Sequence, residues 1–251
     1  MERTAGAASG EAPEFSIVVP VFNEKDSLPA LVEEIRAALV STGRSYEVLL
    51  IDDGSTDGSA AVLDDLAGRA PQVRPVHFET NCGQSEAFAA GFRLARGRIL
   101  VTLDADLQND PADIPALVGR LETEKVGAVI GVRTGRRDSL VRRVSSRVGN
   151  WVRDTLTGDR VTDSGCSLKV FRREALEDVK MFRGMHRFLP TLVRLEGHTV
   201  VEHPVRHRER RYGRSKYGIA NRALTGLVDV FAVRWMRRRA LQYRIRGTGG
   251  A

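Results

Sequence analysis

Two hydrophobic periods alternate regularly along the first 132 residues of this chain, and this alternation limits the folds open to it. Short runs rich in β-branched residues predict strands, and these runs cover residues 16–21, 47–51, 73–78, 99–103 and 126–132. The stretches between them have the apolar spacing of amphipathic helices, near residues 27–41, 57–69, 84–96 and 112–124. Strand–helix alternation with short connections predicts an α/β fold, in which a mainly parallel sheet carries helices on both faces.

Polar motifs follow three of the predicted strands at the point where each strand ends. Phe22-Asn23-Glu24 follows the first strand, Asp52-Asp53-Gly54-Ser55 follows the second, and Asp104-Ala105-Asp106 follows the fourth. Ligands of open α/β sheets bind outside the carboxyl ends of the strands. We therefore expect these three motifs to belong to one site.

The segment DADLQNDP, residues 104–111, carries the clearest chemical signal of the chain. It places Asp104 and Asp106 one residue apart, directly after the apolar run Ile99–Leu103. Mg²⁺ and Mn²⁺ prefer oxygen ligands, and Mg²⁺ is usually held by one or two carboxylates together with the phosphates of a substrate. The segment predicts an enzyme that handles a nucleotide diphosphate, although by itself it also fits a capped, solvated strand end.

The net charge of +7 hides a strong asymmetry between the two parts of the chain. Residues 131–251 hold 28 Lys and Arg against 11 Asp and Glu, a balance of +17, whereas residues 1–130 have a balance of −10. A basic half of this size attracts polyanions, of which nucleic acids and anionic lipid headgroups are the general candidates. No nucleic-acid-binding motif is visible in it, so we expect no nucleic-acid partner.

Targeting and cysteine signals are sparse. No apolar run approaches the roughly 18 residues that a membrane-spanning helix needs, and residues 1–14 predict a short disordered leader. The two cysteines, Cys82 and Cys166, form no CxxC pair, and the histidines show no zinc-binding spacing. We therefore expect neither a disulfide framework nor a zinc site, and a reducing cytosol is the natural compartment.

The second half of the chain is less regular. Strands are predicted near Ser167–Phe171 and Thr199–Val205, with a helix beginning at Arg172 after the first of them. A long final helix, Ile219–Tyr243, ends in basic residues and places apolar side chains along one side: Leu224, Leu227, Val228, Phe231 and Trp235. This helix is predicted to lie in a membrane interface, to dock on a separate membrane subunit or a second copy, or to pack on its own domain.

Taken together, these motifs resemble glycosyltransferase family 2 with the GT-A fold. More narrowly, the chain is similar to the polyprenyl-phosphate glycosyltransferases, the group of dolichol-phosphate mannosyltransferase. The similarity covers nearly the whole chain after residue 14 and rests on seven segments in the family's order: SIVVPVFNE (16–24), IDDGSTDGS (51–59), NCGQSEAFAAGF (81–92), DADLQNDP (104–111), GVR (131–133), DSGCSLKVFRRE (163–174) and RRYGRSKYG (210–218).

The resemblance implies a nucleotide-sugar site at the strand ends. The implied ligands of an Mg²⁺ or Mn²⁺ ion on the diphosphate are Asp104, Asp106 and Gln108. A carboxylate such as Asp52 accepts hydrogen bonds from base N–H or ribose hydroxyl groups. The full set of implied donor-site residues is Pro20, Phe22, Asn23, Glu24, Asp52, Gly54, Ser55, Gln84, Asp104, Ala105 and Asp106.

The resemblance also implies a polyprenyl phosphate as the acceptor. A phosphate monoester has a second pKa near ~6, so it is its own nucleophile and needs positioning more than deprotonation. Arginines and lysines position such a dianion, and the candidates are Arg133, Arg211, Ser215 and Lys216. Arg142 and Arg143 fit a solvated surface better. The implied catalytic residues are Asp104, Asp106, Asp163 and Arg133, with Asp163 orienting the acceptor, acting as a base or forming a structural turn.

These implications define the expected function. Residues 15–216 would form a GT-A catalytic domain and residues 217–251 an amphipathic basic helix and tail. The enzyme would move a sugar from a GDP- or UDP-linked donor to a polyprenyl phosphate with inversion, in the biosynthesis of glycolipids. It would be peripheral on the cytoplasmic face of the membrane, with a homo-oligomer left open. The alternatives are a soluble or polysaccharide acceptor, and a non-catalytic or nucleic-acid-binding module.

Overall fold

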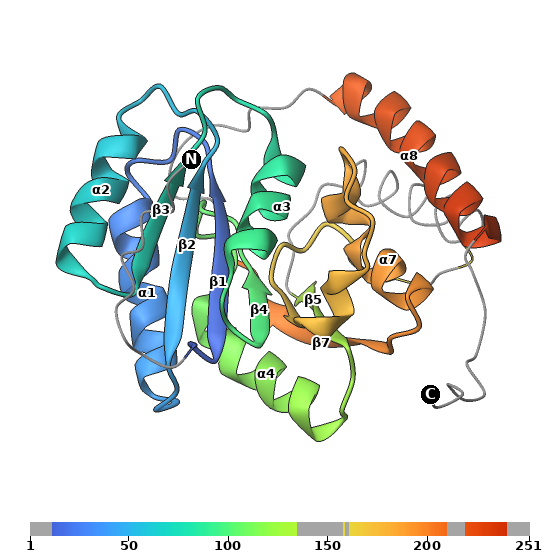
Figure 1. Cartoon of the computed structure of the whole chain (residues 1–251), viewed down its shortest axis with the longest axis horizontal. Coiled ribbons are helices and arrows are strands. Elements are labelled where there is room, and N and C mark those ends of the chain that lie inside the picture. The colour runs from blue at the N-terminus through green and yellow to red at the C-terminus, as the bar shows by residue number, and fades with distance from the viewer. Residues whose placement is uncertain (1–11, 135–157, 159–160, 210–218, 240–251) are drawn as a thin grey trace, which may run out of the picture.

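One mixed sheet forms the centre of the protein (Figure 1). This computed structural model describes residues 12–134, 158, 161–209 and 219–239, and of residues 219–227 only the backbone. The strands described are β1 (Phe15–Val21), β2 (Tyr46–Asp52), β3 (Val73–His77), β4 (Ile99–Thr102), β5 (Ala128–Thr134), β6 (Lys169–Arg172) and β7 (Val200–Arg206). Their order is β3-β2-β1-β4-β6-β5-β7, and β6 runs antiparallel to both of its neighbours while the other pairs are parallel.

Helices cover both faces of this sheet. On one face pack α1 (Leu28–Val40), α2 (Ser59–Arg69) and α4 (Ile114–Thr123), which follows the short 3₁₀ turn η1 (Pro111–Asp113). On the other face pack α3 (Gln84–Leu94), α6 (Glu174–Glu177) and α7 (Leu189–Leu195), with a second 3₁₀ turn, η2 (Met185–Arg187); Val230 and Val233 of α8 (Ile219–Arg239) extend the same apolar cluster. The predicted α/β architecture, a mainly parallel sheet with flanking helices, is confirmed.

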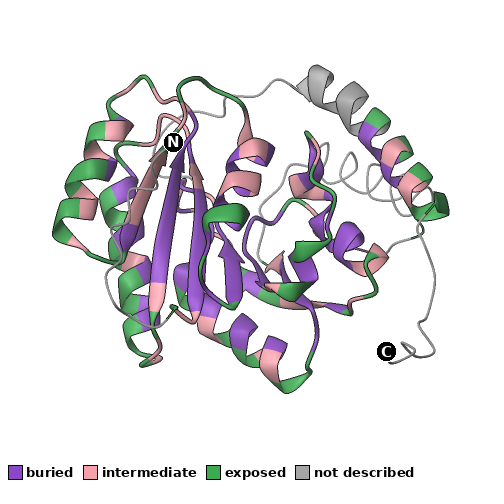
Figure 2. Ribbon diagram, in the orientation of Figure 1, coloured by how far each residue is buried: buried purple, intermediate pink, exposed green. Residues whose placement is uncertain are grey.

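The two-residue period of the strands explains why the sheet is buried on both faces (Figure 2). Along β1, Ile17 and Val19 enter the core under α1, whereas Val18 between them enters the core under α3. Helix α3 lies very close to this strand at Gly91, where an added Cβ atom would stand 2.2 Å from Cγ1 of Val18. Glycine is required there because any side chain would push α3 away from the sheet.

Element boundaries in the first 134 residues agree with the predicted ranges to within two residues. Differences appear in the second half of the chain. The helix predicted from Arg172 is only the single turn α6, and the strand predicted near Ser167–Phe171 is β6, inserted antiparallel between β4 and β5. This insertion was not predicted, because the local apolar pattern of a strand does not specify its partner or its direction.

Helix α8 presents apolar side chains on two sides. Its inward side contributes Val230 and Val233 to the core beside α3 and α7. Its outward side exposes Val228 (62%), Phe231 (53%) and Trp235 (63%). Among the residues described, no helix is long and apolar enough to cross a membrane. The predicted apolar side therefore faces away from the protein over this part of the helix.

Candidate active site

Three polar motifs meet at one edge of the sheet, because β2, β1 and β4 are neighbours and run in the same direction. The loops after β1 and β2 are joined directly. The backbone N–H of Asn23 donates to Ser55 Oγ at 2.9 Å, and Thr56 N–H donates to Asn23 Oδ1 at 2.7 Å. The N–H of Glu24 donates to Ser59 Oγ at 3.0 Å. The two motifs thus form one connected rim, with Pro20 and Phe22 partly exposed beside it.

Gly54 makes the turn after β2 sterically feasible. Its φ of +69° lies in the left-handed region, and an added Cβ atom would stand 2.6 Å from the backbone N of Asn81. The neighbouring Asp53 holds the same segment, accepting from Asn81 Nδ2 at 2.9 Å and from the N–H groups of Cys82 and Gly83 at 2.7 and 3.0 Å. Asp53 is therefore the anchor that places the start of α3 beside the rim.

Asp52, the residue implied to bind the donor, is buried and has a partner that was not predicted. One of its carboxylate oxygens accepts from Ser55 N–H at 3.0 Å, and the other lies 3.1 Å from Nδ1 of His77. His77 also contacts Asp64 at 3.1 Å. Burial of the ring opposes its charge, but these two hydrogen bonds raise the pKa of His77.

Gln84 links the start of α3 to the carboxylate pair. Its Nε2 donates to Asp104 Oδ1 at 2.7 Å, so this amide directly contacts one of the two carboxylates. Burial, and then the negative charge of Asp106, raise the pKa of Asp104 to about 6. The side chain of Ala105 packs in the core, so that only its backbone is left for a ligand. Asp104 and Asp106, on either side of Ala105, are both partly exposed.

A tight turn shapes the segment that follows. Asp106 Oδ1 accepts from the N–H of Gln108 at 3.1 Å, and Leu107 between them has a φ of +61°. The side chain of Ser167 joins this loop to the strand behind it, accepting from Asp104 N–H at 3.2 Å and donating to Asn109 Oδ1 at 2.8 Å. The segment Asp104–Asn109 is thus held at both of its ends.

Arg133 and Asp163 contact each other in a partly buried ion pair. Arg133 Nε and one terminal nitrogen donate to the two carboxylate oxygens of Asp163, both at 2.7 Å, and the Arg133 N–H donates at 3.2 Å. The two side chains are 16% and 12% exposed. Burial disfavours the charge of Arg133, but Asp163 raises its pKa. This pairing was not predicted, and it favours orientation of Arg133 as the role of Asp163.

Lys169 is a further charged residue of the site. It was not predicted as a site residue, although it lies in the segment DSGCSLKVFRRE (163–174). It lies on β6, is 4% exposed, and donates to the backbone carbonyl of Cys166. Burial lowers its pKa, while the charges of Cys166, Asp104 and Asp163 act in the opposite direction. The positive charges of Lys169 and Arg133 in turn limit the rise in the pKa of Asp104. The one sequence signal for its role was a lysine inside the apolar pattern of a strand, where a charged residue is unusual.

The oxygen donors at this site fit Mg²⁺ or Mn²⁺. Burial and the negative charge of Asp106 both raise the pKa of Asp104, and a divalent cation would stabilise the charged carboxylates. Gln108 can add an amide oxygen beside them. In the described part of the chain no three His, Cys, Asp or Glu side chains form a closed metal cage. A carboxylate pair that leaves room for phosphate oxygens and water is the arrangement typical of Mg²⁺ in nucleotide enzymes.

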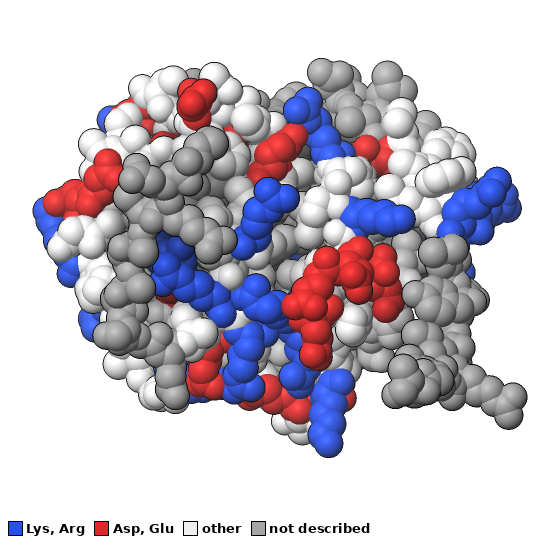
Figure 3. Space-filling view, viewed as in Figure 1, with Lys and Arg blue, Asp and Glu red and all other residues white. Residues whose placement is uncertain are grey.

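Three of the implied acceptor residues, Arg211, Ser215 and Lys216, lie outside the described residues, as do Arg142 and Arg143. Of the implied acceptor set, the structure therefore places Arg133. On the face of the molecule seen in Figure 3, acidic and basic side chains lie next to one another. Among the described residues on that face, the charge asymmetry of the sequence does not appear as a single basic patch.

Comparison with known proteins identifies the relatives of this chain. It is 40% identical over 229 residues to a dodecaprenyl-phosphate galacturonate synthase of Rhizobium johnstonii, covering 90% of this chain and 68% of the relative. It is 41% identical over 203 residues to an undecaprenyl-phosphate 4-deoxy-4-formamido-L-arabinose transferase of Klebsiella pneumoniae, covering 80% of this chain and 62% of the relative. The chain thus spans about two thirds of these curated relatives.

Solved structures show the same fold. A Pyrobaculum calidifontis mannosyltransferase in complex with GDP-Man and Mn²⁺ aligns over 88% of this chain and 64% of its own, with a TM-score of 0.63 and 24% identity. A Mycobacterium tuberculosis glucosyl-3-phosphoglycerate synthase, in complex with Mn²⁺, UDP-glucose and phosphoglyceric acid, aligns over 92% and 81%, with a TM-score of 0.66 and 20% identity. The expected GT-A fold is confirmed. Residues 16–180 match the family described as glycosyl transferase family 2, and the chain belongs to that family.

Proposed function

We propose that this protein transfers a sugar from a nucleotide-diphosphate sugar to a polyprenyl phosphate, with inversion at the anomeric carbon. The observation that carries the proposal is the position of the carboxylate pair Asp104 and Asp106, next to Gln84 and within electrostatic range of Arg133. The carboxylate pair would hold a metal ion on the diphosphate of the donor, and the nearby Arg133 would bind the phosphate of the acceptor. The two curated relatives, whose names specify polyprenyl phosphates, support this acceptor.

Different parts of the site would perform different tasks. The rim formed by the loops after β1 and β2 would bind the base and ribose, with Asp52 oriented by Ser55 and His77. Asp104, Asp106 and Gln108 would hold Mg²⁺ or Mn²⁺. Such an ion acts as a Lewis acid that neutralises charge on the leaving diphosphate. No base is required, because the acceptor phosphate is already anionic near neutral pH.

The acceptor would be oriented by the cations on the other side of the carboxylate pair. Asp163 holds the guanidinium of Arg133 in one position through two hydrogen bonds. A fixed arginine loses less conformational entropy when it binds a phosphate. Attack of a phosphate oxygen on the face of the sugar opposite the leaving diphosphate inverts the anomeric configuration.

The direct test is a donor screen with the purified protein, Mg²⁺ or Mn²⁺, and a short-chain polyprenyl phosphate. The panel contains GDP- and UDP-sugars, including uronic acid and 4-formamido sugars, and the lipid product is measured by mass. A single sugar on the lipid phosphate is the expected result. If the donor is consumed with a soluble phosphorylated acceptor but not with the lipid, the acceptor is a soluble molecule and not a polyprenyl phosphate. Absence of transfer from a folded protein would favour a non-catalytic role.

We also propose that α8 carries the enzyme to a membrane surface. Phe231 and Trp235 lie on its exposed side, and the arginines 237–239 follow in its last turn. Aromatic side chains beside arginines are typical of helices that lie at the level of anionic headgroups.

Replacing Phe231 and Trp235 together by serine is expected to weaken binding to vesicles containing anionic phospholipid by at least about tenfold, because two large apolar groups no longer enter the interface. Co-sedimentation measures this. The matched control is Val40→Ser, which removes an apolar side chain that is 58% exposed on α1. Equal binding of all three proteins would contradict the membrane role, and a change in molecular mass by light scattering would assign the face to a second copy.

A further inference from the structure

The loop that carries Asp104, Asp106 and Gln108 is hydrogen-bonded to the segment that follows β7. Asn109 and His207 form an antiparallel bridge, and the backbone N–H of Arg208 donates to the carbonyl of Gln108 at 2.8 Å. Gln108 is one of the implied metal ligands. Its backbone position is therefore set by a residue one hundred positions further along the chain.

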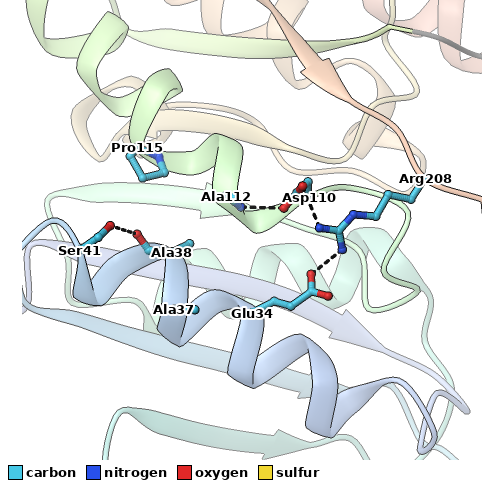
Figure 4. Close-up of a pocket in the computed structure, with 8 residues that line it drawn as sticks. All are labelled: Glu34, Ala37, Ala38, Ser41, Asp110, Ala112, Pro115 and Arg208. Carbon is cyan, nitrogen blue, oxygen red and sulfur yellow. Dashed lines mark hydrogen bonds and ion pairs between the residues drawn. The ribbon is translucent and has the colours of Figure 1, made fainter.

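The side chain of Arg208 extends this connection to α1. One terminal nitrogen lies 2.8 Å from Asp110 Oδ2 and the other lies 2.6 Å from Glu34 Oε2, so the guanidinium bridges two carboxylates (Figure 4). Asp110 is only 8% exposed, and its other oxygen caps η1 by accepting from Ala112 N–H at 3.0 Å. An arginine in this geometry is held firmly, because its planar fork makes several directed hydrogen bonds.

These contacts do not form a second ligand site. The pocket that they line, between α1 and η1, has a volume of about 410 Å³. Its two carboxylates, Glu34 and Asp110, are already paired with Arg208 (Figure 4). The cluster therefore joins three segments of the fold, and both of its carboxylates already have the same cationic partner.

We propose that Arg208 is a positioning residue for the metal-binding loop. Through Gln108 and Asp110 it fixes the C-terminal half of the turn that begins at Asp106, and through Glu34 it ties this half to the rigid helix α1. The inference rests on the proposed metal-dependent function. Residues that orient metal ligands through hydrogen bonds typically change metal affinity or activity by about 10- to 100-fold when they are replaced.

The test is Mn²⁺ binding by the folded protein, measured by the electron paramagnetic resonance signal of the free ion. Arg208→Met, which keeps the apolar stem and removes the fork, is expected to weaken Mn²⁺ binding about tenfold. Arg208→Lys, which can reach only one carboxylate well, is expected to restore part of the affinity. Arg36→Met is the matched control, because Arg36 is 55% exposed and pairs with Glu33 within α1, away from the turn. It is expected to bind Mn²⁺ within about twofold of the unmodified protein.

A purely structural role would lower the unfolding midpoint of Arg208→Met without changing the Mn²⁺ affinity of the folded protein, and that result would overturn the inference. Glu34→Gln provides a milder second variant, expected to shift the affinity in the same direction by a smaller factor, should Arg208→Met not fold. Equal Mn²⁺ affinities in all variants would reject the positioning role alone. Absence of Mn²⁺ binding by the unmodified protein would reject the metal-dependent function and, with it, this inference.

Discussion

Asp106→Ala is expected to reduce sugar transfer by about 10³-fold or more while leaving the protein folded. A divalent cation stabilises developing charge on the leaving diphosphate by several kcal/mol, and each ~1.4 kcal/mol corresponds to a factor of ten in rate. Asp106 is partly exposed at the end of the strand segment and contributes no apolar contact to the core. The measurement is the initial rate of lipid-linked product, together with the Mn²⁺ affinity of the folded variant.

Two further variants separate the charge of Asp106 from its structural role. Asp106→Asn keeps an oxygen that can accept from the N–H of Gln108, and thus preserves the turn, but it removes the negative charge. It is expected to lose nearly as much activity as Asp106→Ala. Asp64→Asn, at an exposed carboxylate beside His77, is the control and is expected to keep most of the activity. Full turnover by Asp106→Asn would show that the carboxylate does not bind the metal.

Asp163→Ala is expected to lower the free energy of unfolding by about 2 kcal/mol, less than the roughly 3–5 kcal/mol typical of a fully buried ion pair, because Arg133 and Asp163 keep some contact with solvent. The guanidinium of Arg133 is 16% exposed and would lose both of its side-chain hydrogen bonds, and the Arg133 N–H would lose its acceptor. Urea denaturation, followed by circular dichroism, measures the change.

The double variant Arg133→Met/Asp163→Leu tests the origin of this loss. Removal of both charges is expected to recover most of the stability, since well-packed apolar residues often replace a buried ion pair without a penalty. The double variant should nevertheless remain inactive, because it lacks the guanidinium proposed to bind the acceptor phosphate. Stability of Asp163→Ala within about 1 kcal/mol of the unmodified protein would contradict the structural role of the pair, since that is the range of exposed ion pairs.

Local sequence signals located the residues at the sheet edge, but not the contacts that these residues make. The carboxylate pair Asp104 and Asp106 was located from a local signal, an apolar run followed by acidic residues, and the structure places both at the sheet edge where the loops after β1 and β2 meet. The partner of Asp52 was not predictable in this way. His77 lies opposite Asp52 because β3 pairs with β2 in one register, and nothing in either strand alone specifies that register.

Local sequence patterns were sufficient to predict the order of strands and helices in the first 134 residues, the α/β class and the three polar motifs at strand ends. Those features depend on hydrophobic periodicity and turn chemistry over a few residues, which act locally. The folded structure was needed to show that β6 inserts antiparallel between β4 and β5, with Lys169 opposite Thr102 and Asp163 hydrogen-bonded to Arg133. Strand pairing joins distant segments through backbone hydrogen bonds, which any residue except proline can donate, so the pattern of side chains leaves the partner undetermined.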